Sequence, residues 1–413
     1  MAPNTENWGG DVEDYARRLA GQLGVADFVY EPMRVAKGKG TVEVSDGVIA
    51  SGNFGAILQV KSREKMVAGR DTPERAVSWI ESNVEKAARQ GSGTRREIGR
   101  QPVSLTSLRG YERTFSDAGD WPIVVIVHHP VGPSGLLIEP EQDRCLVITL
   151  DDWLGLNTRL RSTAGVLHYI NRALDCPIRP ELGREYDRYL QLALADARAP
   201  GGADSFPTLP LVPIADDDLV YSMIAEDLVE KVWPNDGPIP WHAPDDYRRI
   251  VECLDDIPLP IRIDVGRKMF GTFSESWDTH TRRSFLSTFP QFNLQIAVVY
   301  DHLDRYTTQD AFTYKIAALA QVRHVEAQEK TELEIRRTLG IGRLGGDTPA
   351  TAAYAFAYVE GDVAPARSLR WRVNTEFGTL KGGTINPVAA PPRNAPCPCG
   401  SGRKFKRCCQ PAL

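Results

Sequence analysis

The chain has 413 residues, which is long enough for two or three domains with cores of their own. Hydrophobic residues make up 42% and charged residues 25%, so the composition excludes a mostly disordered, collagen-like or coiled-coil protein. The net charge of -5, from 49 basic and 54 acidic residues, argues against whole-chain attraction to nucleic acid or to an anionic membrane.

The first 175 residues alternate helix-like and strand-like patterns. Apolar residues at helical spacing predict helices over 12–23, 73–90 and 156–174. Short runs of strand-forming residues predict strands over 28–30, 41–49, 54–60, 123–127 and 145–149. The dipeptide Gly52-Asn53 is typical of a two-residue hairpin loop and joins the second of these strands to the third. Mixed strands with covering helices predict an α/β domain over residues 1–175.

The chain changes character between residues 176 and 389, where proline-rich stretches interrupt helix-like runs such as 219–232 and 311–339. Residues 201–260 contain 13 acidic and three basic side chains, so this region should repel a phosphate backbone. One strong strand is predicted over 293–300. We therefore expect a second α/β or mostly helical domain of unknown function over 176–389, and a small tail over 390–413.

The predicted hairpin gathers polar residues on one face. A two-residue loop at Gly52-Asn53 places Asp46 directly opposite Gln59, and Lys61 shares their face because side chains alternate along a strand. Carboxylate and amide oxygens suit Mg²⁺, a hard cation often completed by substrate phosphate. Lys61 could orient or deprotonate an attacking water, or neutralise charge in the transition state. The arrangement indicates metal-assisted hydrolysis of a phosphodiester.

This pattern resembles a known nuclease family. Asp46-Gly47, twelve intervening residues and Gln59-Val60-Lys61 are similar to the core of the PD-(D/E)XK superfamily, in its Mrr-like variant with glutamine. The resemblance implies a restriction-endonuclease-like mixed sheet flanked by helices, Mg²⁺ held by Asp46 and Gln59, and a role for Lys61 in activating water. Glu13 matches a glutamate of the family's first helix and would assist the metal. Because Gln59 replaces an acid, one-metal chemistry and weaker metal affinity are expected.

Other interpretations of the same residues remain open. Asp46 could simply begin a turn and Lys61 a solvated stretch, or the domain could be a nuclease fold without activity. Residues 61–113 contain 12 basic and seven acidic side chains, so a local basic patch could hold DNA phosphates beside the predicted site.

Four cysteines, Cys397, Cys399, Cys408 and Cys409, lie within the last seventeen residues. Four thiolates on a short glycine-containing turn can complete a tetrahedral structural Zn²⁺ site, and metal binding would supply folding energy to a tail too short for a core. The run CPCGSGRKFKRCC closely resembles the SEC-C motif, the zinc-binding tail of the SecA translocase. That resemblance implies protein interaction, with a chaperone or a ribosome as partner.

We therefore expect a cytoplasmic, Mg²⁺-dependent DNA endonuclease with a zinc tail, since no leader or membrane-spanning pattern is apparent. Restriction or defence against phage is the setting that the Mrr-like resemblance implies. The alternative is a non-catalytic adaptor that docks a chaperone, a ribosome or a nucleic-acid complex through its tail. The oligomeric state is not indicated by the sequence.

Overall fold

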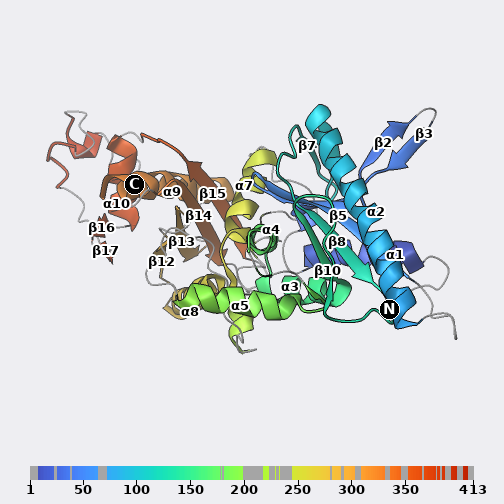
Figure 1. The fold of residues 1–413 in the computed structure, drawn as a ribbon. Helices are drawn as coiled ribbons and strands as arrows, with labels where there is room; N and C mark the ends of the chain where they lie inside the picture. Colours follow the sequence, from blue (N-terminus) through green and yellow to red (C-terminus); the bar gives the residue numbers. More distant parts are fainter. Residues whose placement is uncertain are drawn as a thin grey trace. The chain divides into compact units, whose positions relative to one another are not determined.

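The computed structural model divides the chain into two compact units, Met1–Pro213 and Ile214–Leu413 (Figure 1). It describes residues 8–22, 26–37, 40–63, 72–176, 178, 181–198, 217–222, 228, 232, 244–279, 281–289, 293–302, 308–330, 335–345, 352–364, 367–377, 379–381, 384–386, 392–397 and 403–407.

A five-stranded mixed sheet forms the centre of the first unit. Its strands lie in the order β1 (Val29–Tyr30), β4 (Gly47–Ser51), β5 (Phe54–Ser62), β8 (Ile123–His128) and β10 (Cys145–Thr149). Strand β4 is antiparallel to both of its neighbours, whereas β5, β8 and β10 are parallel. Three small sheets accompany it, β2 (Arg34–Lys37) with β3 (Gly40–Glu43), β6 (Val103–Thr106) with β7 (Glu112–Phe115), and β9 (Leu136–Leu137) with β11 (Glu181–Leu182).

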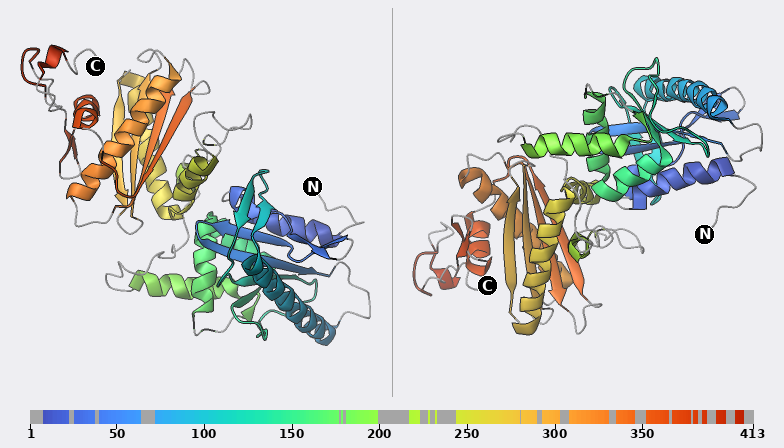
Figure 2. Two further views of the ribbon diagram at one scale, coloured as in Figure 1. Left: turned by 90° about the horizontal axis from the view of Figure 1, so that it is seen from above. Right: turned by 60° about the horizontal axis from the view of Figure 1, so that its bottom comes forward.

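Helices cover both faces of this sheet (Figure 2). On one face, α1 (Trp8–Gln22) packs its apolar residues into the same buried cluster as Leu58 and Val60 of β5. On the other face, α2 (Pro73–Arg100) packs against Val125 and Val127 of β8. The remaining elements are η1 (Ala26–Phe28), α3 (Leu150–Leu160), α4 (Thr163–Leu174) and α5 (Glu185–Arg198). The first unit is thus a helix–sheet–helix sandwich.

Two predicted helices differ from the structure. The region predicted as one helix over 156–174 forms α3 and α4, because Arg161 takes a left-handed conformation (φ 46°) and Ser162 caps the second helix. The helix predicted over 73–90 continues to Arg100. The first unit also extends beyond residue 175, because Tyr189 and Leu192 of α5 belong to the same core as α1.

The second unit contains a four-stranded sheet in the order β12 (Arg283–Phe289), β13 (Leu294–His302), β14 (Arg337–Gly345) and β15 (Ala353–Glu360). Strands β13 and β14 are parallel and the outer pairs are antiparallel. The other elements are α7 (Pro244–Asp255), α8 (Leu259–Thr279), α9 (Gln309–Lys330), α10 (Arg367–Phe377), the pair β16 (Thr379–Lys381) and β17 (Thr384–Asn386), and η5 (Phe405–Arg407). Helices α8 and α9 lie on opposite faces of the sheet (Figure 2).

The second unit is therefore α/β rather than mostly helical. The helix predicted over 311–339 ends at Lys330, and its last residues belong to β14, which begins at Arg337. Of the helix predicted over 219–232, only 219–222, 228 and 232 fall within the described residues. In the described part of the chain, no helix is both long and apolar enough to cross a membrane.

Candidate functional site

The hairpin of β4 and β5 has the predicted register. Gly47 pairs with Leu58 and Ser51 with Phe54, so the turn at Gly52 and Asn53 places Asp46 opposite Gln59. Gly52 has φ 55°, a conformation that favours glycine in such a turn. The alternation of strand residues then directs Gln59 and Lys61 to the α2 face, while Leu58 and Val60 face α1.

Asp46 and Lys61 meet at the end of this hairpin. Lys61 Nζ lies 3.6 Å from Asp46 Oδ2, and the two side chains keep 19% and 14% of their surface exposed. The Val60 N–H donates to the same carboxylate oxygen at 2.5 Å. No donor bonds the other oxygen, Oδ1, among the residues that the structure describes. Within the described residues, the carboxylate is therefore anchored through one oxygen only.

Gln59 is almost fully buried, at 1% exposure, and its amide nitrogen donates to the backbone carbonyl of Val44 at 3.1 Å. Val44 lies two residues before Asp46, so the Gln59 amide contacts the chain segment that leads into the acid. The buried hydroxyl of Thr94, on α2, donates to the same carbonyl. Thr94 was not predicted as a site residue, because a threonine inside a helix carries no motif.

Helix α1 reaches the site through Arg17, which is buried and donates to the backbone carbonyl of Asp46. Its second guanidinium nitrogen donates to Asp14 at 2.6 Å. Glu13, the other predicted site residue, lies one turn before Arg17 on the same helix and is partly buried. The structure thus brings Asp46, Gln59 and Lys61 together at one end of the hairpin, with Glu13 on the helix that contacts Asp46.

The donor set fits a hard divalent cation through Asp46 Oδ1 and Gln59 Oε1, since carboxylate and amide oxygens are the ligands that Mg²⁺ accepts while keeping several waters. Among the described residues, no group of three or more His, Cys, Asp or Glu could hold a metal ion. Asp46 and Gln59 together would offer two oxygens and one negative charge, and the one-metal site expected from Gln59 stays a prediction.

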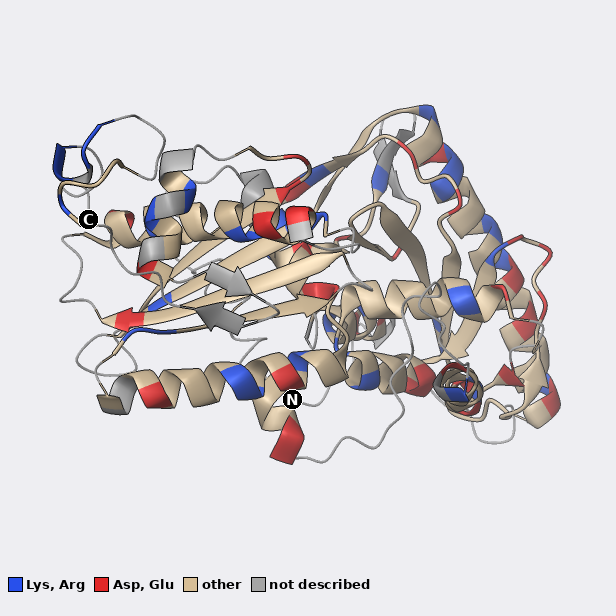
Figure 3. Ribbon diagram, turned by 90° about the vertical axis from the view of Figure 1, so that its left-hand side faces the viewer, with Lys and Arg blue, Asp and Glu red and all other residues tan. Residues whose placement is uncertain are grey.

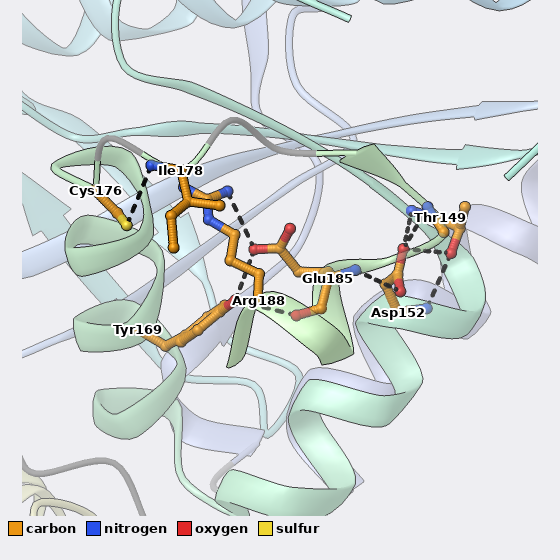
Figure 4. Close-up of polar contacts among 8 residues, drawn as sticks. Thr149, Asp152, Tyr169, Cys176, Ile178, Glu185 and Arg188 are labelled. Atoms are coloured by element: carbon orange, nitrogen blue, oxygen red, sulfur yellow. Dashed lines mark hydrogen bonds and ion pairs between the residues drawn. The ribbon is translucent and has the colours of Figure 1, made fainter. Parts of the chain in front are cut away.

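A second polar cluster lies at the same edge of the sheet, around the carboxyl end of β10 (Figure 4). Thr149 shares a row with Val127 and Lys61, two strands away. The Asp152 carboxylate accepts bonds from the Thr149 backbone and hydroxyl, at 3.1 and 2.7 Å, and from the backbone N–H groups of Gly183 and Glu185. Because it joins the start of α3 to the start of α5, this cluster has a structural role.

Beside it, the Tyr169 hydroxyl donates to Glu185 Oε1 at 2.7 Å, and Arg188 lies 3.5 Å from the same oxygen. Burial raises the pKa of Glu185 above its ordinary value, although Arg188 opposes the shift. Glu185 Oε2 is buried with no hydrogen-bond partner among the described residues. The sequence offered no signal for this group, because its members come from α4 and α5.

A pocket of about 590 Å³ opens at the other end of the hairpin, lined by Phe54, Arg113, Asp117 and Trp121 among others. It lies at the turn, whereas Asp46 and Lys61 lie at the opposite ends of the two strands. Asp46, Gln59 and Lys61 therefore lie outside this pocket, and these three polar residues define the candidate site.

The two described segments of the cysteine tail, 392–397 and 403–407, are hydrogen-bonded to each other. The Cys397 N–H donates to the Arg403 carbonyl at 2.7 Å, and Pro396 pairs with Lys404 in an antiparallel bridge. Cys397 is buried at 4% exposure. The turn η5 (Phe405–Arg407) follows and ends directly before Cys408 in the sequence. Cys399, Cys408 and Cys409 lie outside the described residues.

Residues 393–411 match the model of the SEC-C motif. The tail carries a SEC-C motif. No curated protein and no solved structure matches the chain. Five basic side chains of the motif are exposed: Arg393, Arg403, Lys404, Lys406 and Arg407. The motif contains no acidic residue, and in Figure 3 the described ribbon beside the C-terminus has the colour of basic residues.

Proposed function

We propose that the first unit is a PD-(D/E)XK-like nuclease domain and that the protein is an Mg²⁺-dependent DNA endonuclease. The observation that carries the proposal is the meeting of Asp46 and Lys61, 3.6 Å apart, beside the buried amide of Gln59. A mixed sheet between helices supports the same interpretation. Restriction or phage defence is the setting that the Mrr-like resemblance suggests.

The substrate would be held by basic side chains of the same unit. Helix α2 begins at Pro73, and from Lys86 onward it exposes the basic side chains Lys86, Arg89, Arg96 and Arg100. Phosphate contacts by such side chains provide most of the affinity of sequence-independent DNA binding and make it depend on salt. The acidic total of the chain does not oppose this local attraction.

Each residue has a defined task in the proposed reaction. Asp46 and Gln59 would hold the cation, which when bound supplies an activated water and neutralises phosphate charge. The Asp46 carboxylate also keeps the Lys61 ammonium at the end of β5. From there Lys61 donates to the attacking water or to a phosphate oxygen and stabilises the negative charge that develops in the transition state. Arg17 holds the Asp46 backbone and positions its carboxylate.

Plasmid cleavage tests the proposal. The full chain should nick supercoiled DNA with Mg²⁺ and lose this activity when a chelator removes the metal. Asp46→Asn and Lys61→Met should each lower the rate about 100-fold or more, by removal of a ligand or of a transition-state donor. Asp143→Asn, a change at an exposed loop residue, is the matched control and should retain the wild-type rate. Absence of nicking by folded wild-type protein, or full activity in both site variants, would contradict the proposal.

The tail supports a second, compatible function. We infer that its four cysteines hold one structural Zn²⁺ and present the exposed basic residues to a partner, either an acidic protein surface or nucleic acid. The burial of Cys397 and its hydrogen bond to Arg403 are compatible with such a site.

Metal analysis of the purified chain tests the zinc site. It should find one zinc per chain, which Cys397→Ser loses and Cys176→Ser keeps, because Cys176 lies in the first unit and not in the motif. A zinc content unaffected by Cys397→Ser would contradict the assignment.

A further inference from the structure

The backbone carbonyl of Val44 accepts two hydrogen bonds from side chains that lie far apart in the sequence. One comes from Gln59 Nε2 on β5, at 3.1 Å, and the other from the Thr94 hydroxyl on α2. Both donors are buried, Gln59 at 1% and Thr94 at 0% exposure. The Val44 carbonyl lies two residues before Asp46 and therefore links helix α2 to the candidate metal site.

The Val44 carbonyl determines which end of the Gln59 amide faces it. A carbonyl oxygen can only accept, so it must meet the amide NH₂ group, and a flipped amide would place two oxygens against each other. The Gln59 oxygen is therefore directed away from Val44. Within the described residues, no donor bonds this oxygen. Among the described residues, this buried side chain thus has an uncommitted acceptor, on the residue that the register places opposite Asp46.

Thr94 keeps the Val44 carbonyl in place. Its single hydroxyl proton has two acceptors within reach, Val44 O and, at 3.2 Å, the carbonyl of Gln90 one turn earlier in its own helix. Threonines inside helices commonly bond back to that earlier carbonyl. The contact with Val44 joins α2 to the segment that leads into Asp46, which a bond to Gln90 within the same helix would not do.

We propose that Thr94 is a positioning residue for the metal site. Through the Val44 carbonyl it holds the Gln59 amide with its oxygen toward the cation that Asp46 binds. Partners that orient metal ligands typically change metal affinity about 10-fold or more when removed. The inference rests on the proposed nuclease function, because it assumes that Asp46 and Gln59 are the ligands.

The test compares Thr94→Val, which keeps the shape and removes the hydroxyl, with Thr94→Ser, which keeps the hydroxyl. Calorimetry with Mn²⁺ alone, on the full chain without DNA, measures metal affinity directly. Thr94→Val should raise the Mn²⁺ Kd and the Mg²⁺ concentration for half-maximal nicking about 10-fold, and Thr94→Ser should stay within about twofold of wild type. DNA affinity in chelator should not change, because phosphate contacts do not involve the metal ligands.

The outcomes separate this inference from the nuclease proposal. If wild type binds Mn²⁺ and nicks DNA, Asp46→Asn loses both, and Thr94→Val behaves as wild type, only the role of Thr94 is overturned. Equal losses in Thr94→Val and Thr94→Ser would also overturn it, because the hydroxyl would then be irrelevant. If wild type neither binds Mn²⁺ nor nicks DNA, the metal site itself is refuted. Thr94→Ala provides the same comparison should the valine variant fail to fold by circular dichroism.

Discussion

Gly55, on β5, should not tolerate even one methyl group. A Cβ at this position would lie 2.5 Å from Cδ2 and Cζ2 of the Trp121 indole, about 1 Å closer than carbon atoms in contact allow. The indole is only 9% exposed and lies against the Phe115 ring, with centroids 5.3 Å apart, so it cannot withdraw without disturbing the cluster. We expect Gly55→Ala to cost about 3 kcal/mol, the upper end of the usual range for overpacking.

The matched control is Gly93→Ala on α2, where no heavy atom lies within 4 Å of the added carbon. There alanine should stabilise the helix interior by about 0.5–1 kcal/mol. Thermal unfolding followed by circular dichroism should show Gly55→Ala melting about 6–12 °C below wild type, on the scale for a unit of this size, and Gly93→Ala slightly above it. Melting of Gly55→Ala within about 1 °C of wild type would refute the packing argument.

Two further predictions concern buried charges. Because burial raises the pKa of Glu185, its stabilising contribution is complete below the ordinary value of 4.5 and is lost as pH rises through the raised pKa of the folded state. The glutamine of Glu185→Gln cannot ionise, so the free energy of unfolding of this variant in urea should rise relative to that of wild type between pH 5 and pH 8. A difference between the two proteins that does not depend on pH would contradict this prediction. In the second unit, Arg323→Met should cost about 3–5 kcal/mol because Glu326, 2.6 Å from the guanidinium and 2% exposed, loses its ion pair with Arg323 and keeps only the neutral donor Asn374 among the described residues. Arg323→Met with Glu326→Leu should recover most of that loss in the same urea assay, and a double variant as unstable as the single one would show that charge pairing is not the cause.

The hairpin register was predictable because its determinants are local. A two-residue loop with Gly52 at positive φ leaves one pairing, and that pairing sets which residues oppose each other along both strands. The position of Asp46 opposite Gln59 followed from the turn alone. The contacts with Arg17 and Thr94 did not, since these residues lie on helices whose positions depend on packing in the whole unit.

Helix ends were predicted less well, for reasons visible at single residues. The run Gly91-Ser92-Gly93 suggests a helix end, yet α2 continues because Gly91 packs closely on Ile123, where a Cβ would approach Cγ2 to 2.6 Å. Thr94 and Ile98 then continue the buried face of the helix. Conversely, the apolar period over 156–174 runs through Arg161 without a visible break, although the backbone turns left-handed there. Local patterns record which side chains are apolar, whereas packing decides where a helix stops.

The second unit contains a similar hairpin with an ion pair, but both oxygens of its aspartate are already hydrogen-bonded. Like the first unit, it passes from a helix (α8) through an antiparallel strand pair (β12, β13) and a crossover helix (α9) to a parallel strand (β14). An ion pair again joins the two hairpin strands, with the charges exchanged: Arg282 precedes β12, and Asp301 lies near the end of β13. Both Asp301 oxygens are occupied, one by Arg282 and the other by the His302 N–H at 2.9 Å.

That difference is the basis for proposing a ligand site at Asp46 and a structural ion pair at Asp301. Asp301 is fully buried, and its charge is already neutralised by Arg282, so a cation would have to break a buried pair at a cost of several kcal/mol. Asp46 remains partly exposed and, among the described residues, has donors on one oxygen only. A carboxylate in a hairpin is therefore not sufficient evidence for a metal site. The uncommitted oxygen beside Lys61, together with the oriented Gln59 amide, is the reason for placing the proposed reaction in the first unit.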